Sequence, residues 1–180
     1  MSEDRSSISW RKDYFLKEND FVGGIDPTSS YQAESHTTLS YFCEFDDKET
    51  SSRFKKKIKN IRVVAFFNPS LSWLKKDEVS ANNMSDLLKH EQGHFDGAEE
   101  FARKLQKYLE KEFVGKTITC AGETETERSD SLNKILKKKS HKISADLGVF
   151  HRTYDNETNH GRISTTQKEY NKRFDLLREE

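Results

Sequence analysis

Two segments in the first part of the chain alternate between apolar and polar positions. The apolar positions are Leu39, Tyr41, Cys43 and Phe45 in the first segment, and Ile61, Val63, Ala65 and Phe67 in the second. Alternation with a period of two, in aromatic and β-branched residues, is typical of half-buried β-strands. The pattern therefore predicts a small sheet within 36–67, preceded by an irregular arm with short strands over 1–35.

From Asn83 onward the apolar positions recur every three or four residues, which is the period of an amphipathic helix. Asn83 is a suitable N-cap residue and Gly115 is a suitable stop, so one long helix is predicted over 83–114. Of all the elements in the chain, this helix has the strongest sequence signal.

A second apolar stripe predicts that the C-terminal part, 123–178, is helical as well. A polar segment over 155–161 predicts a loop, and a short last helix follows it over 164–178. Strand signals come first along the chain and helix signals follow, an order typical of α+β proteins. We therefore expect a single α+β domain over 1–180.

Charge adds an exclusion to this picture, because Lys+Arg and Asp+Glu are equal at 31 each. Zero net charge removes the overall electrostatic case for a nucleic-acid partner, and the basic runs at 55–57 and 137–139 are expected to be solvated surface. No stretch approaches the roughly 20 apolar residues of a membrane span. With 34% charged residues, the chain is expected to fold as a very hydrophilic domain.

Two cysteines, Cys43 and Cys120, are too few for a disulfide scaffold and do not form a C-x-x-C pair. They are expected to be two unpaired thiols or, in an oxidising compartment, a single bridge. The acidic start of the chain, 1–4, has no apolar segment behind it, so no signal peptide is expected.

The sharpest chemical signal is an H-E-x-x-H motif, His90-Glu91-Gln92-Gly93-His94, inside the predicted long helix. Residues four apart lie one turn apart on the same helix face, so His90 and His94 can converge on one ion. Zn²⁺ prefers such nitrogen ligands, and in a catalytic site it takes a third protein ligand and a water. Glu91 is close enough to take a proton from that water, whose pKa the metal lowers to about 7.

Glu100 is one candidate for the third ligand. It stands at the last position of the extended metzincin motif H-E-x-x-H-x-x-G-x-x-H, in which the helix must break at the glycine. Here the apolar stripe continues past Gly97, so the helix is predicted to continue and Glu99 and Glu100 to be solvated.

The polar segment after the second stripe offers better candidates. His160 is the natural nitrogen ligand there and Glu157 the oxygen alternative, while Asp155 is suited to hold a ligand histidine in place. Tyr154 is either a donor to a developing oxyanion or a core aromatic. His151 flanks the stripe near this segment and is a weaker candidate for a donor. No role is predicted for the two other histidines, His36 and His141.

The chain resembles a family of bacterial proteins known as predicted, often secreted, Zn-dependent proteases of zincin type. The segments that carry the resemblance are 8–10, 20–23, 71–73, 87–96 and 154–161. The resemblance implies metal ligands at His90 and His94, a base at Glu91 and, by position, a third ligand at His160. It also implies export, whereas the start of this chain leaves a cytoplasmic location open.

These signals together predict a zinc metallopeptidase of zincin-like α+β fold that acts on a peptide or protein substrate. By analogy with zincins, the substrate is expected between the strand 61–67 and the long helix. The alternative is a non-catalytic binding module in which zinc stabilises a core-poor domain. Glu91 discriminates between them, because a structural zinc site has no need of a base beside its ligands.

Overall fold

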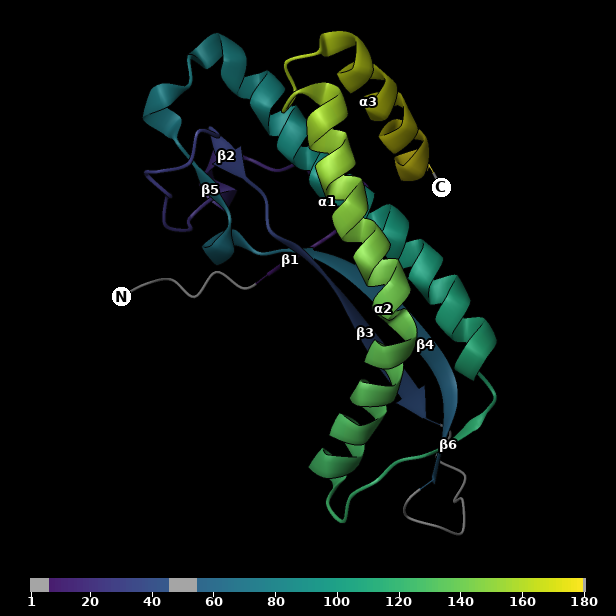
Figure 1. Cartoon of the computed structure of the whole chain (residues 1–180). Helices are drawn as coiled ribbons and strands as arrows, with labels where there is room; N and C mark the ends of the chain where they lie inside the picture. Colours follow the sequence, from purple (N-terminus) through teal and green to yellow (C-terminus); the bar gives the residue numbers. More distant parts are fainter. Residues whose placement is uncertain (1–6, 46–54, 180) are drawn as a thin grey trace.

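The computed structural model describes residues 7–45 and 55–179, and its strands lie beneath a layer of long helices (Figure 1). The main sheet is antiparallel and is built on the long strand β4 (Lys55–Phe67). Strands β3 (Thr37–Phe45), β1 (Ile8–Ser9) and β6 (Thr117–Thr119) all pair with it. The predicted α+β class and small sheet are confirmed, and the second strand begins six residues before the predicted 61–67.

Burial along β4 follows the predicted alternation. Ile61, Val63, Ala65 and Phe67 are each no more than 7% exposed. Ile58 is also fully buried, three positions before Ile61, because the pairing with β3 shifts register between Glu44 and Phe45. Such a β-bulge changes which face of the sheet the next side chains occupy.

A second, two-stranded antiparallel sheet joins β2 (Ala33–Glu34) to β5 (Trp73–Leu74). Short 3₁₀ helices at Glu18–Asp20, Pro69–Leu71 and Lys76–Glu78 connect these strands to the rest of the fold. The irregular arm expected over 1–35 thus carries two very short strands within its described part.

Helix α1 (Ala81–Phe113) is 33 residues long and packs its apolar stripe against β4. It begins two residues before the predicted N-cap Asn83, because Ser80 takes the extended cap conformation and its carbonyl accepts from Asn83 N. Its end agrees with the prediction, since Gly115 follows with a φ of 79°.

Helix α2 (Glu125–Thr158) runs back along α1, and α3 (Ser164–Glu179) packs on α1 beside the C-terminal part of α2 (Figure 1). The loop predicted over 155–161 is wrong in its first half, because α2 continues to Thr158. Tyr154 and Thr158 extend the buried stripe by one more turn, and no glycine or proline lies between Gly148 and Gly161.

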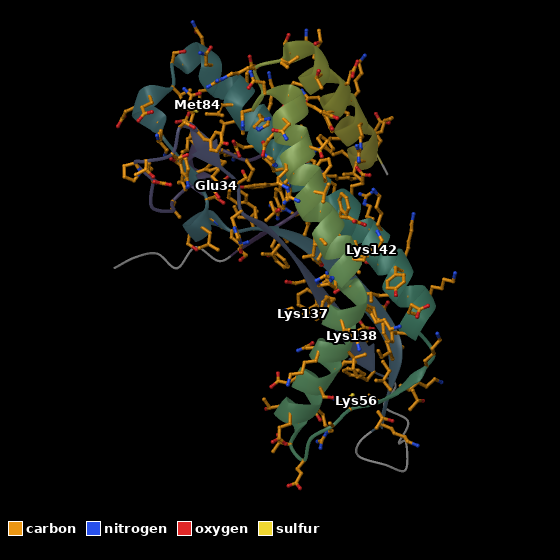
Figure 2. The ribbon with its side chains drawn as sticks, in the orientation of Figure 1. Glu34, Lys56, Met84, Lys137, Lys138 and Lys142 are labelled. Atoms are coloured by element: carbon orange, nitrogen blue, oxygen red, sulfur yellow. The ribbon has the colours of Figure 1, made fainter. Side chains whose placement is uncertain are left out.

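The basic run 137–139 is exposed, as expected. Figure 2 shows Lys137, Lys138 and Lys142 along α2, well separated from Glu34 of β2. Cys43 and Cys120 are both free thiols in this structure. Among the described residues, no helix is long and apolar enough to cross a bilayer.

Candidate metal centre

Two facing helices bring together residues spaced one turn apart. Helix α1 supplies His90 and His94, and α2 supplies His151 and Asp155. Asp155 Oδ1 lies 3.1 Å from His90 Nε2 and 3.0 Å from His94 Nε2. The ligand atoms of His90, His94 and Asp155 all lie within 4.8 Å of one another, so this group could hold a metal ion.

The orientation of His90 explains why a cation fits between these groups. Its Nδ1 lies 3.2 Å from Gln167 Oε1 and 3.4 Å from Thr158 Oγ1. Both oxygens act as acceptors there, because the Gln167 amide nitrogen donates to Tyr154 and the Thr158 hydroxyl donates to the Tyr154 carbonyl. The neutral His90 ring therefore carries its proton on Nδ1.

It follows that the lone pair of His90 Nε2 points at a carboxylate oxygen 3.1 Å away. Two acceptors at that distance repel unless a cation, a proton or a metal ion, lies between them. With two imidazoles and one carboxylate facing one point, the donor set fits a divalent transition metal.

His94 is held in a different way. Its Nδ1 lies 3.0 Å from Nδ1 of His151, whose Nε2 lies 3.2 Å from Thr37 Oγ1 on β3. Burial is the main cause that lowers the pKa of His151 to about 3, and the nearby His94 ring is the second cause. His151 is therefore neutral near pH 7 and can accept a hydrogen bond at one ring nitrogen.

The carboxylate at the centre stays ionised. Burial alone would raise the pKa of Asp155, but the two imidazoles of His90 and His94 that face it outweigh this effect and hold that pKa well below its usual range. Burial likewise lowers the pKa of His94, but Asp155 and Glu91 reverse this effect and raise it overall. The site is therefore electrostatically suited to a positive charge.

Tyr154 was a candidate for an oxyanion donor, and its position argues against that role. It is fully buried, its hydroxyl donates to the His90 carbonyl at 3.1 Å, and it accepts from Gln167 at 2.7 Å. Its ring stacks on the His90 ring with centroids 4.7 Å apart. The prediction of a core aromatic fits, and the Tyr154 ring supports the His90 ring by stacking on it.

Two glycines of α1 allow α2 to come this close. A Cβ at Gly93 would lie 2.1 Å from the Tyr154 hydroxyl, and one at Gly97 would lie 2.0 Å from Phe150 Cε1. Since both glycines stand on the same helix face, they form a groove that receives one turn of α2. The helix continues through Gly97, as predicted.

His160 lies beside the three-residue group without belonging to it. Its Nδ1 is 3.5 Å from Asp155 Oδ1, and its ring packs on Tyr31 with centroids 4.4 Å apart. Asn159 and His160 both adopt left-handed conformations, with φ of 47° and 53°. This turn, which is costly for a histidine, places the His160 ring at the edge of the site. Its assignment as a metal ligand remains a prediction.

The other carboxylates considered as ligands point elsewhere. Glu99 pairs with Arg103 at 2.9 Å, and Glu100 pairs with Lys104 at 2.8 Å and also with Arg173 of α3. The alternative ligand Glu157 is exposed and accepts from the Tyr170 hydroxyl at 2.6 Å.

Glu91 faces a cleft of about 590 Å³ that His90, His94 and Asp155 also line. Among the described residues, only two buried side-chain oxygens lack a hydrogen-bond partner, Glu91 Oε2 and Ser35 Oγ, and both residues line this cleft. A buried carboxylate oxygen without a partner is costly and is explained by a ligand or water that belongs there.

The wall of the cleft opposite α1 corrects one prediction. Ala33, Glu34 and Ser35 line it, whereas the predicted strand 61–67 does not. That strand is part of β4, which lies between β1 and β3 inside the main sheet. The short strand β2 therefore occupies the place that sequence order suggested for 61–67.

Sequence reasoning missed the contacts made by His151, Thr158 and Gln167. His151 and Asp155 have the same four-residue spacing as His90 and His94, and that spacing was the available signal. No sequence signal points to Gln167, because its role depends on how α3 packs.

No protein-family model, curated protein or solved structure matches this chain.

Proposed function

We propose that the protein is a zinc-dependent hydrolase of peptide bonds. One observation carries the proposal: His90 and His94 of an H-E-x-x-H motif both direct Nε2 at Asp155 Oδ1, beside Glu91, whose Oε2 lacks a hydrogen-bond partner among the described residues. Two imidazoles and one carboxylate are a ligand set that catalytic zinc uses in other enzymes. In this proposal Asp155 takes the place of His160 as the third ligand.

Glu91 is the general base. Its Oε2 oxygen accepts a proton from the attacking water and then delivers that proton to the leaving amine. When bound, zinc supplies the Lewis acid that makes the water acidic and polarises the scissile carbonyl. Glu91 is buried beside the ligand group, so its carboxylate is held in place before the substrate arrives.

A histidine at the cleft edge supplies the donor role once considered for Tyr154. His160 lines the cleft, and its ring packs against Tyr31 with an interplanar angle of 37°. A ring N–H at that edge donates to the oxygen on which negative charge develops.

An extended peptide fits the wall formed by β2. Among the described strands, β2 pairs with β5 alone, so its second edge is free to bind a peptide backbone. The Ser35 hydroxyl at the end of this strand is available to a substrate polar group.

A structural zinc site is the rival, and the open cleft disfavours it. Structural zinc is usually enclosed by four protein ligands, whereas three ligand residues here border a cleft of about 590 Å³.

The test compares wild type with Glu91→Gln in zinc content and in cleavage of a denatured protein substrate. We expect Glu91→Gln to keep one equivalent of zinc and to lose at least about 100-fold in turnover, the scale of a lost general base. Glu99→Gln, on the same helix, is the matched control and should keep both. Equal turnover in wild type and Glu91→Gln would refute the proposal.

A further inference from the structure

His151 makes two contacts that the proposed reaction does not require. It lies on α2 one turn before Asp155, so both side chains face the histidine pair of α1. Its Nδ1 meets His94 Nδ1 at 3.0 Å, and its Nε2 meets Thr37 Oγ1 of β3 at 3.2 Å. The ring thus bridges a metal-ligand residue and the main sheet.

The protonation of His94 fixes the direction of these hydrogen bonds in the loaded site. Nε2 of His94 is the nitrogen directed at Asp155, so it is the one available to a metal. The ring proton of His94 must then be on Nδ1. His151 Nδ1 lies 3.0 Å away and accepts the hydrogen bond from that N–H. His151 in turn carries its proton on Nε2, which donates to the Thr37 hydroxyl oxygen.

We propose that His151 is a positioning residue for the metal ligand His94, which it holds in the Nδ1–H tautomer by accepting its ring proton. The inference rests on the proposed metal site. Metal-binding histidines commonly donate their second ring nitrogen to a carboxylate or a carbonyl. Here one ligand, His90, uses the side chains of Gln167 and Thr158, and the other uses a second imidazole.

A packing role for His151 is separable from an acceptor role. Leucine fills similar space and offers no acceptor, whereas the Oδ1 of asparagine occupies nearly the place of the histidine Nδ1. His151→Leu therefore removes the hydrogen bond and keeps bulk, and His151→Asn restores the acceptor. His141, exposed on the same helix, provides the matched control His141→Leu.

The experiment measures zinc affinity of the full chain by competition with a chromophoric chelator. We expect His151→Leu to weaken binding about 10- to 100-fold, the usual effect of losing such a partner. His151→Asn should recover most of that loss, and His141→Leu should bind like wild type. Wild-type affinity in His151→Leu, or equal losses in the Leu and Asn variants, would overturn the proposal.

Nitrogen-15 NMR of the imidazoles provides a readout in zinc-loaded wild type, independent of whether any variant folds. The expected pattern is a proton on Nδ1 of His94 and on Nε2 of His151, and a proton on Nδ1 of His151 refutes the assignment. If wild type binds no zinc, this inference and the proposed function both fail. If zinc binds and Glu91→Gln proves fully active, the hydrolase mechanism fails while His151 is still judged by affinity and NMR.

Discussion

The indole nitrogen of Trp10 donates to Asp96 Oδ1 at 2.7 Å, although the two residues are 86 positions apart in the chain. Gln92 Nε2 and the Arg178 guanidinium donate to the same oxygen. Gln92 also accepts from the backbone nitrogen of Leu16 at 2.7 Å. The side of α1 that faces away from His90 and His94 thus binds the N-terminal arm. The arm continues into β2, which forms the wall of the cleft.

The first prediction concerns this buried cluster. Asp96→Asn leaves the Arg178 guanidinium, whose side chain is only 8% exposed, without its counter-charge. Because an unpaired buried charge is costly, we expect the free energy of unfolding to fall by about 2–4 kcal/mol. Urea unfolding monitored by circular dichroism measures this change.

The matched control is Asp86→Asn, which breaks the exposed pair with Lys89 on the same helix. Exposed pairs contribute little, so its effect should stay below about 1 kcal/mol. Equal losses in the two variants would show that the cluster around Asp96 does not stabilise the arm.

The second prediction concerns the contact of α1 with α2. Gly97→Ala would raise helix propensity, yet its methyl group would lie 2.0 Å from a ring carbon of Phe150. Overpacking of this kind costs about 1–3 kcal/mol, which exceeds the gain of about 1 kcal/mol in helix propensity. We expect a net loss of stability and weaker metal binding, because α2 carries Asp155.

Gly148→Ala on α2 is the control, since its nearest neighbour would be an arginine side-chain atom at 3.7 Å. It should stabilise the protein by about 0.5–1 kcal/mol. A stabilising Gly97→Ala would mean that Phe150 moves aside freely.

The parts of the site that are set by spacing within one helix could be predicted from the sequence, whereas the parts set by long-range packing could not. The pair His90 and His94 was predictable because spacing within one helix determines it. Asp155 was expected near a ligand histidine, but its polar surroundings suggested a loop, and it lies instead in the last turn of α2. A polar helix end that faces a cleft has the same composition as a loop, so composition could not separate the two.

The cleft wall shows the other limit. Strand β2 has two residues, too few for a periodic pattern, and its place beside α1 is set by pairing with β5 and by the arm. Proximity in the sequence favoured 61–67 as the cleft wall instead, but this segment belongs to β4, which lies between β1 and β3 in the main sheet. Long-range packing of short segments determines this part of the site.

The third prediction tests the ligand set. Asp155→Ala removes the oxygen that both histidines face, so zinc affinity should fall by more than about 100-fold, beyond the usual effect of an outer partner. His160→Ala should keep zinc within about tenfold of wild type while turnover falls. Asp146→Ala is the control, because this partly exposed residue lies on the same helix and pairs with Lys142. The reverse order of affinities would favour the ligand set that the family resemblance implies.

The fourth prediction concerns Cys43, a half-buried thiol on β3. Burial raises its pKa from 9.0 to about 11. Near pH 8 the folded protein should therefore hold about 100-fold less Cys43 thiolate than the unfolded chain. In a Cys120→Ser background, the reaction of native protein with a disulfide reagent should be slower than that in urea by about this factor.

The pH dependence of the reaction rate separates the raised pKa of Cys43 from simple steric protection of the thiol. The native rate should keep rising up to about pH 11, whereas that of the unfolded chain should level off above about pH 9. The folded state keeps the Cys43 thiol proton to a higher pH than the unfolded state does. The contribution of this group to the free energy of unfolding is therefore complete below pH 9 and is lost as the pH rises from 9 towards 11. Cys43→Val should remove this part of the alkaline loss of stability. A native rate that levels off near pH 9 would show that the thiol titrates normally and that access alone slows it.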